Sequence, residues 1–241
     1  MTSLRTAAAA GALLSSVAGV AAAQTAPHAA PLHTYLDASR VVATRDSFVI
    51  MANGRVAGSQ RYEIAKLPKG WRFIDAVTLG TDVEQQSHIE TDAQLREITL
   101  EQKGRMRNQP MAISLKMTGG RVQGLSQTPT SGPNGMAVNT EAPDGVVDDN
   151  AVVPLLWAMR WREGLDIRFP VISSGKGDVS TYRLRVIGAD TTTVPMGHFN
   201  TWRAELEAER FAMVLHVTRD APHRMVRISI KNAPMDMQRV K

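Results

Sequence analysis

An acidic stretch near the middle of the chain could supply oxygen ligands for a metal ion or carboxylates for catalysis. It contains Asn139, Glu141, Asp144, Asp148, Asp149 and Asn150. Carboxylate and amide oxygens on a flexible loop can bind Ca²⁺. However, their spacing does not match the calcium-binding loop of about 12 residues, and the glycine stands in the wrong place. We therefore expect a solvated loop in which Asp149 or Asn150 caps the following helix, and we expect no metal site.

Histidines and serines offer no recognisable catalytic motif. The histidines that could bind zinc or transfer protons are His88, His198, His216 and His223. None has the helical spacing and neighbouring glutamate of a metalloprotease. His216 lies between Leu215 and Val217, which is typical of a hydrogen-bonded histidine in a strand. The serine hydrolase motif Gly-x-Ser-x-Gly is missing, and residues 173–176 (SSGK) resemble a turn. We assign no catalytic residue and no cofactor, and we expect a protein that is not an enzyme.

Among the methionines, Met235 and Met237 have the spacing that most suggests a metal site. Two thioethers at positions i and i+2 can bind Cu(I). The same spacing also places both side chains on one face of a strand, and methionine commonly fills irregular apolar cavities. We expect the pair to line a core or a cavity, with copper binding as the alternative.

Alternating apolar and polar residues predict strands over most of the chain. The predicted strands are residues 47–51, 55–65, 71–77, 95–101, 111–117, 121–125, 165–171, 180–189, 198–208, 211–218, 225–230 and 235–240. Asn53-Gly54 and Gly119-Gly120 are typical of tight hairpin turns. Leu95 and Ile98 have a spacing that also fits a helix. The fold class predicted from this pattern is mainly β.

One irregular stretch interrupts the strands. Residues 126–148 are rich in Pro, Gly, Asn, Ser and Thr, and we expect a long loop across an open face. A short helix should follow over about residues 150–161, with Pro154 in its first turn. Trp157 and Trp161 would share one face of that helix and pack it against one end of the sheet.

The N-terminus has the pattern of a cleavable secretory signal peptide. Residues 1–23 begin with the single charge Arg5, continue as an apolar Ala-rich run and end in Ala21-Ala22-Ala23. Residues 24–34 are expected to form a flexible leader, and residues 35–241 a single β-rich domain. We expect the mature protein in the bacterial periplasm. The chain contains no cysteine, which excludes disulfides, thiolate metal sites and a lipid-bearing cysteine.

Charge and hydropathy argue against nucleic-acid binding and against a membrane-spanning segment. The formal net charge is +5, but the basic residues are scattered among apolar ones rather than clustered. An exported chain without aromatic–basic clusters is not expected to bind nucleic acid. After the signal peptide no stretch is long enough to span a membrane.

The C-terminal part contains the stretch Tyr182–Gly188, the turn Val194-Pro195-Met196-Gly197-His198-Phe199 and the following Thr201 and Arg203. In these features it resembles the exported bacterial family known as domain of unknown function 3108 (DUF3108). Glu163-Gly164 and the early hairpin at residues 54–58 also fit. This family implies a single strongly curved antiparallel sheet or partial β-barrel, with one or two short helices, similar to periplasmic lipoprotein carriers. It implies no catalytic residues.

We expect a non-enzymatic protein that holds an apolar or lipid-like envelope ligand on a concave β surface. The alternatives are a hydrolase acting on envelope polymers through carboxylates of residues 139–150, and a structural partner of another envelope protein. Side chains of one parity in each strand should face the ligand. The expected ligand-binding residues are Met111, Ile113, Leu115, Met117, Phe211, Met213, Leu215 and Trp157. At least two of the three stripes, which start at Met111, Phe211 and Met235, should converge on one apolar cavity.

Overall fold

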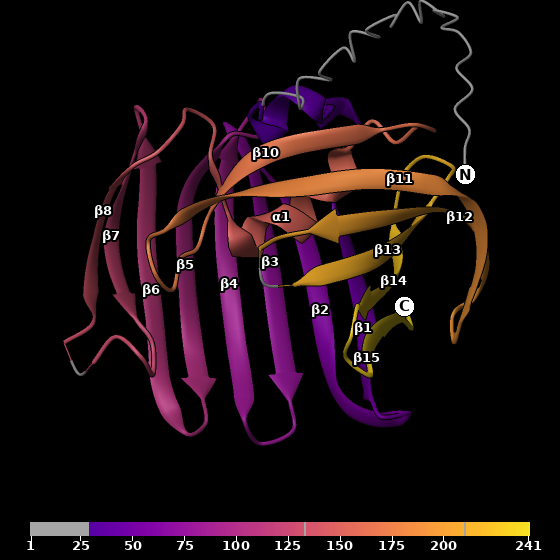
Figure 1. Cartoon of the computed structure of the whole chain (residues 1–241), viewed down its shortest axis with the longest axis horizontal. Helices are drawn as coiled ribbons and strands as arrows, with labels where there is room; N and C mark the ends of the chain where they lie inside the picture. The colour runs from indigo at the N-terminus through magenta and orange to yellow at the C-terminus, as the bar shows by residue number, and fades with distance from the viewer. Residues whose placement is uncertain (1–28, 133, 210) are drawn as a thin grey trace, which may run out of the picture.

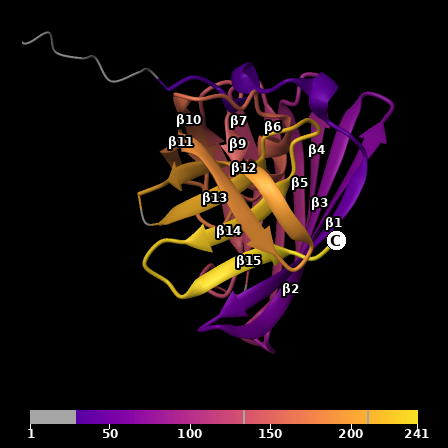
Figure 2. The same cartoon turned by 90° about the vertical axis from the view of Figure 1, so that its right-hand side faces the viewer.

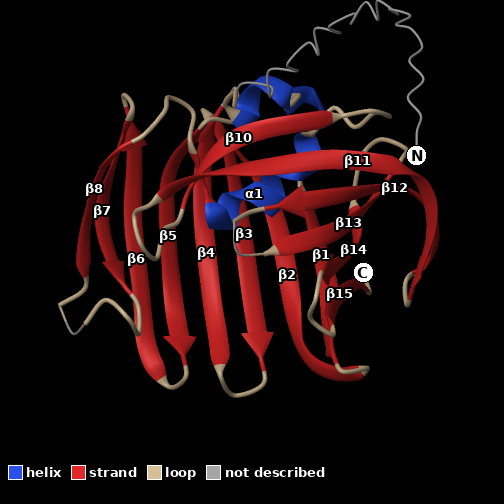
Figure 3. Cartoon of the chain, in the orientation of Figure 1, coloured by secondary structure: helices blue, strands red, loops and turns tan. Residues whose placement is uncertain are grey.

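The computed structural model describes residues 29–132, 134–209 and 211–241, and most of them lie in strands (Figure 3). The N-terminal strands are β1 (Thr44–Ala52), β2 (Arg55–Leu67), β3 (Gly70–Leu79), β4 (Val83–Asp92), β5 (Glu97–Met106), β6 (Gln109–Thr118), β7 (Arg121–Gln127) and β8 (Met136–Glu141). The C-terminal strands are β9 (Val147–Asp148), β10 (Asp166–Ile172), β11 (Val179–Val194), β12 (Gly197–Glu207), β13 (Ala212–Thr218), β14 (Met225–Ile230) and β15 (Met235–Arg239). The fold is mainly β, as predicted.

All fifteen strands belong to one sheet, whose edges are β8 and β9. The edges do not pair with each other, so the sheet is not closed into a barrel. Neighbouring strands are antiparallel except for β9 and β10, which are parallel. The two halves of the sheet meet where β1 pairs with β15, and Phe48 lies opposite Arg239. At this junction the buried Arg239 guanidinium forms an ion pair with the buried Asp46.

The two halves of the sheet form layers whose strands cross. In Figure 1, β10–β13 run across the N-terminal strands, and α1 (Asp149–Leu155) lies between the layers. Figure 2 shows the C-terminal strands as a layer beside the N-terminal ones. Helix α1 contacts β3 on one side and β10 on the other. Apolar residues of both layers and of α1 form one core cluster, which includes Ile113, Leu155 and Leu215.

Local residue choices explain why these strands form. Buried and exposed residues alternate along β6, in which Met111, Ile113 and Leu115 face the core. Asn53 and Gly54 have φ angles of 52° and 74°, which the tight turn between β1 and β2 requires. All the predicted strands are present. Strand β4 was not predicted, because its sequence VEQQSHIETD is too polar to show the alternation.

The predicted loop and helix need correction. Residues 126–148 are not one loop, because they include the end of β7, strand β8 and strand β9. The predicted helix over 150–161 is shorter: α1 ends at Leu155, and a 3₁₀ turn, η3 (Leu156–Ala158), completes it. Trp161 lies beyond both, where its Nε1 donates to the Leu156 carbonyl at 3.0 Å. The helix cap is Asp148, because its side chain accepts the Asn150 N–H.

The described part of the N-terminal segment packs against the core. The signal peptide prediction and residues 24–28 of the predicted leader lie outside the described residues. The rest of the leader enters the fold, because Leu32 in the 3₁₀ turn η1 (Leu32–Tyr35) is fully buried. A second 3₁₀ turn, η2 (Ala38–Arg40), precedes β1. No helix among the described residues is both long and apolar enough to cross a membrane.

Candidate functional site

Two buried carboxyl groups lie where α1 meets β5. Asp148 caps α1, and its side chain accepts the Asn150 N–H at 2.8 Å. The backbone N–H of Asp148 donates in turn to Glu97 Oε2 at 2.6 Å. Glu97 is 5% exposed and Asp148 is fully buried. We call Glu97 and Asp148 the carboxyl pair.

Burial changes the protonation of the carboxyl pair. It raises the pKa of Glu97 to about 8, and the negative charge of Asp149 acts in the same direction. Burial also raises the pKa of Asp148 well above its usual range, with further contributions from Asp149 and Glu97. Glu97 Oε1 and Asp148 Oδ2 have no hydrogen-bond partner among the described residues. Glu97 is therefore mainly protonated at pH 7.

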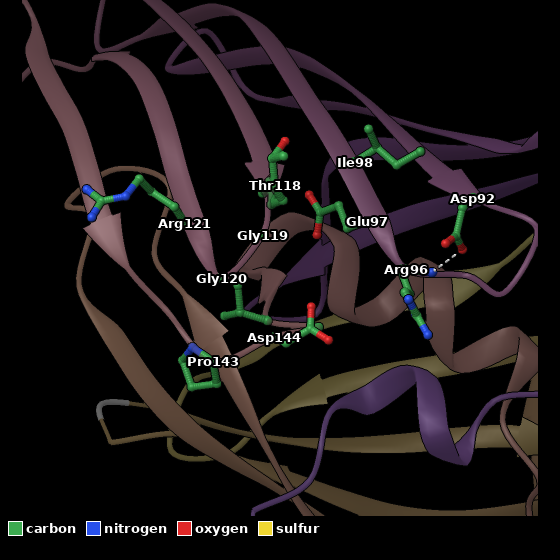
Figure 4. Close-up of a pocket in the computed structure, with 13 residues that line it drawn as sticks. Asp92, Arg96, Glu97, Ile98, Thr118, Gly119, Gly120, Arg121, Pro143 and Asp144 are labelled. Atoms are coloured by element: carbon green, nitrogen blue, oxygen red, sulfur yellow. Dashed lines mark hydrogen bonds between the residues drawn. The ribbon is translucent and has the colours of Figure 1, made fainter.

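Glu97 also lines a cavity of about 200 Å³, which we call the acid pocket. Its lining residues are Asp92, Arg96, Glu97, Ile98, Met117, Thr118, Gly119, Gly120, Arg121, Pro143, Asp144, Gly145 and Val146. Figure 4 shows the Glu97 side chain extending toward the turn at Thr118–Gly119, with Asp144 near Pro143 on another wall. The pocket thus has a buried acid inside and charged residues around it.

Glycines with positive φ angles shape two walls of the acid pocket. Gly119 and Gly120 have φ angles of 58° and 74° in the turn between β6 and β7. Gly145 has a φ of 73°, and a Cβ atom there would lie 2.6 Å from the ring of His33. Any larger residue at position 145 would be strained and would clash with η1. The wall formed by residues 143–146 is therefore fixed by packing against His33.

Only some charges of the acid pocket are neutralised within the chain. Arg121 donates to Glu141 at 2.8 Å. Asp92 accepts the backbone N–H groups of Gln94 and Arg96 at 2.8 and 2.9 Å. The Arg96 guanidinium and the Asp144 carboxylate form no hydrogen bond or ion pair within the described part of the chain. These two charged groups are available to an occupant of the pocket.

A second cavity, of about 460 Å³, lies on the other side of α1's first turn, and we call it the methionine pocket. Its lining residues are Gln85, Gln102, Met106, Arg107, Met111, Ile113, Thr128, Pro129, Thr130, Asp149, Asn150, Ser173, Ser174, Gly175 and Lys176. Met111 and Ile113 are buried, whereas Arg107 and Lys176 are exposed. The pocket combines an apolar floor with a polar rim that carries two cations.

A hydrogen-bonded wall separates the methionine pocket from the carboxyl pair. Gln102 Nε2 donates to Asn150 Oδ1 at 3.4 Å, and Asn150 Nδ2 donates to Asp148 Oδ1 at 2.8 Å. Ser174 Oγ donates to Asp149 Oδ1 at 2.9 Å. Each of these polar groups is held by a neighbour, so the wall is preorganised.

The predicted ligand-binding residues are distributed over several places. Met111 and Ile113 line the methionine pocket, and Met117 lines the acid pocket. Phe211 lines a cavity of about 180 Å³, which shares Asp149, Ser173 and Lys176 with the methionine pocket.

The remaining predicted residues belong to the core. Leu115, Leu215 and Trp157 are buried there, and the partly buried Met213 packs against the core cluster. The Trp157 ring meets Tyr62 edge to face, with centroids 5.1 Å apart. Helix α1 and η3 thus fill the space between the layers, where the sequence analysis places the ligand.

The other candidate ligands and bases have structural surroundings. His216 Nε2 lies 3.3 Å from Asp190 Oδ2, in agreement with the predicted hydrogen-bonded strand histidine. Burial lowers the pKa of His216. Met237 packs against the core cluster, next to Met235 in β15. Among the described residues no group of three or more His, Asp or Glu side chains is arranged to hold a metal.

Glu97 was not predicted as a site residue, because an acid between Arg96 and Ile98 resembles an ordinary surface residue. Glu97 and Leu100 are both buried, so the alternation breaks between them, while the apolar Ile98 between them is 39% exposed. The acid therefore lies inside and the isoleucine outside, the reverse of what their residue types predict. Leu95 has a φ of 64° and belongs to the turn before β5.

Comparisons with known proteins place the chain in a family. A crystal structure of a β-barrel-like protein of domain of unknown function DUF1849 from Brucella abortus is similar, with a TM-score of 0.51 and 12% identity. The similarity covers 83% of this chain and 95% of that protein, and it shows the fold alone. No curated protein matches the chain. The model of the DUF3108 family, described as a protein of unknown function, matches residues 49–234. Because the match covers most of the sequence, this chain belongs to the DUF3108 family.

Proposed function

We propose that this protein is a non-enzymatic periplasmic binding protein for an amphipathic, lipid-like ligand, which it holds in the methionine pocket. The observation that supports this proposal is the composition of that pocket. Met106, Met111 and Ile113 provide a flexible apolar floor, and Arg107 and Lys176 provide cations at the rim. A ligand with an acyl chain and an anionic group matches both parts.

The concave surface that binds the ligand is the flank of α1 rather than the space that α1 fills. The cavity next to Phe211 extends this surface, because Asp149, Ser173 and Lys176 border both cavities. A long ligand would lie along the Ser173–Lys176 turn, with its anionic group near Lys176. The signal peptide pattern of residues 1–23 supports a site of action in the periplasm.

Two of the carboxylates that the hydrolase alternative would use are already engaged within the chain. Asp148 is inaccessible and caps α1, and Glu141 is paired with Arg121. A structural partner of another envelope protein is the second candidate, because the two layers enclose a core that the chain itself fills with α1 and Trp157.

A fluorescence titration tests the proposal. A solvatochromic acyl dye is added to the folded, delipidated mature chain, and fatty acid, fatty alcohol and phospholipid compete for the site. We expect saturable binding that is weakened at least tenfold by Met111→Gln and unchanged by Met196→Gln, because Met196 is an exposed turn residue. Lys176→Gln should weaken the binding of fatty acid but not that of fatty alcohol. If the dye does not bind the folded chain, the carrier function is wrong and the structural partner is favoured.

A further inference from the structure

Glu97, which lines the acid pocket, has one buried carboxyl oxygen without a hydrogen bond to any described residue. Glu97 is 5% exposed, lines the pocket, and its Oε1 has no partner among the described residues. Its other oxygen, Oε2, accepts the Asp148 N–H. Figure 4 shows the Glu97 carboxyl group on the side of the pocket that faces the Thr118–Gly119 turn. A buried polar atom without a partner costs free energy, which a donor in the pocket would recover.

The charges near Glu97 favour a donor that is positively charged. The charged or titratable groups of the surrounding elements are Asp92, Arg96, Asp144, Arg121, His33, Asp148 and Asp149. Arg121 is neutralised by Glu141, and burial lowers the pKa of His33, so that His33 is mainly neutral at pH 7. Burial raises the pKa of Asp148 well above its usual range, so Asp148 adds no negative charge, but Asp92, Asp144 and Asp149 still outnumber the remaining cation, Arg96.

We propose that the acid pocket binds a ligand through a primary ammonium group, which donates to Glu97 Oε1 and pairs with Asp144. The free guanidinium of Arg96, on the same pocket, accommodates an anionic group of that ligand. Phosphoethanolamine has both groups, either as a free compound or as the headgroup of phosphatidylethanolamine. This site is independent of the proposed carrier function, because the two pockets share no lining residue.

Binding of an ammonium group should be coupled to release of a proton. Below its pKa of about 8, Glu97 is mainly neutral, and a cation next to it favours the ionised form. At pH 7 the complex should therefore release a proton from Glu97. The affinity should rise between pH 6 and pH 8, by at most about tenfold per pH unit.

Isothermal titration calorimetry of the full mature chain tests this site with four probes: phosphoethanolamine, ethanolamine, phosphocholine and inorganic phosphate. Buffers of different ionisation enthalpy report the proton release at pH 7. We expect phosphoethanolamine to bind with proton release. Phosphocholine should bind at least tenfold more weakly, because its quaternary nitrogen has no N–H. Inorganic phosphate should not bind measurably.

Three variants test whether phosphoethanolamine binds in the acid pocket. Glu97→Gln keeps an oxygen for the Asp148 N–H but removes the charge, and it should weaken phosphoethanolamine binding at least tenfold. Asp144→Asn changes an exposed side chain, so it folds normally and should weaken binding severalfold. Glu101→Gln is the control, because Glu101 is on the same strand but exposed and bonded to Ser114.

Vesicle flotation separates the two sources of the headgroup. Binding to vesicles of phosphatidylethanolamine but not phosphatidylcholine, lost in Glu97→Gln, would assign a lipid. Binding of free phosphoethanolamine alone would assign a water-soluble ligand. The site is refuted if neither amine binds, if inorganic phosphate binds as tightly as phosphoethanolamine, or if Glu97→Gln and Asp144→Asn both bind like the wild type.

Discussion

The backbone N–H of Asp148 donates to Glu97 Oε2 at 2.6 Å and thereby joins the start of α1 to β5. The two residues are 51 positions apart in the sequence. The bond places the carboxyl pair between the acid pocket, which Glu97 lines, and the methionine pocket, which Asp149 and Asn150 line. A buried side chain of β5 thus holds the residue that caps α1 between the two layers.

Stability should decrease as the pH rises through about 8. The pKa of Glu97 is raised from 4.5 to about 8 in the folded chain. Its contribution to the free energy of unfolding is therefore complete below pH 4.5 and is lost above pH 8. Burial raises the pKa of Asp75 to about 7, so Asp75 also makes the chain less stable as the pH rises. Urea unfolding at pH 6 and pH 9 should differ by about 2–3 kcal/mol or more. In Glu97→Gln the difference should be smaller, and equal pH dependence in both proteins would contradict this assignment.

Trp157→Ala should destabilise the chain by about 3–5 kcal/mol, because the side chain is 2% exposed and packs against Tyr62 between the layers. Chemical denaturation measures the change. Trp202→Ala is the control: its half-buried ring lies under Arg219, and its loss should cost less. A change below about 0.5 kcal/mol for Trp157→Ala would show that η3 does not pack in the core.

Asp46→Ala should cost about 3–5 kcal/mol, because it leaves the Arg239 guanidinium buried without its partner at the junction of β1 and β15. Equilibrium unfolding compares it with Glu84→Ala, which breaks the exposed pair with Arg105 and should cost less than about 1 kcal/mol. Similar losses in the two variants would mean that the junction does not depend on this ion pair.

Gly124→Ala should destabilise the sheet by about 1–3 kcal/mol more than Gly188→Ala. The two glycines have φ angles of 155° and 157°, so the backbone strain of a larger residue is matched. A Cβ atom at position 124 would lie 1.9 Å from the Ser114 carbonyl oxygen, whereas nothing lies within 4 Å at position 188. Thermal unfolding of both variants measures the difference, and equal melting temperatures would argue against the close approach of β6 and β7.

The mature protein should begin near Gln24, because the small residues Ala21–Ala23 provide the cleavage site. N-terminal sequencing of protein released by osmotic shock checks this prediction. Recovery of a chain that still begins with Met1 in the membrane fraction would overturn both the cleavage and the periplasmic location.

The sequence by itself determined the strands and the family, because both depend on local signals. Alternation along 111–117 predicts which side chains of β6 are buried, and the Asn53-Gly54 turn predicts the hairpin of β1 and β2. Strand β4 was not predicted, because it has no apolar pattern of its own. Neighbouring strands bury its Ser87 and Ile89.

Only the tertiary structure decided where the candidate sites lie. The pairing of β1 with β15 brings the two ends of the domain together, and nothing in either strand specifies a partner so distant in sequence. Helix α1 fills the space between the layers, and Trp157, Leu115 and Leu215 belong to the core there. In the sequence Glu97 looks like an ordinary surface acid. In the fold it is buried and mainly neutral, because the residues around it exclude water. Such burial depends on residues far apart along the chain, which spacing and composition do not describe.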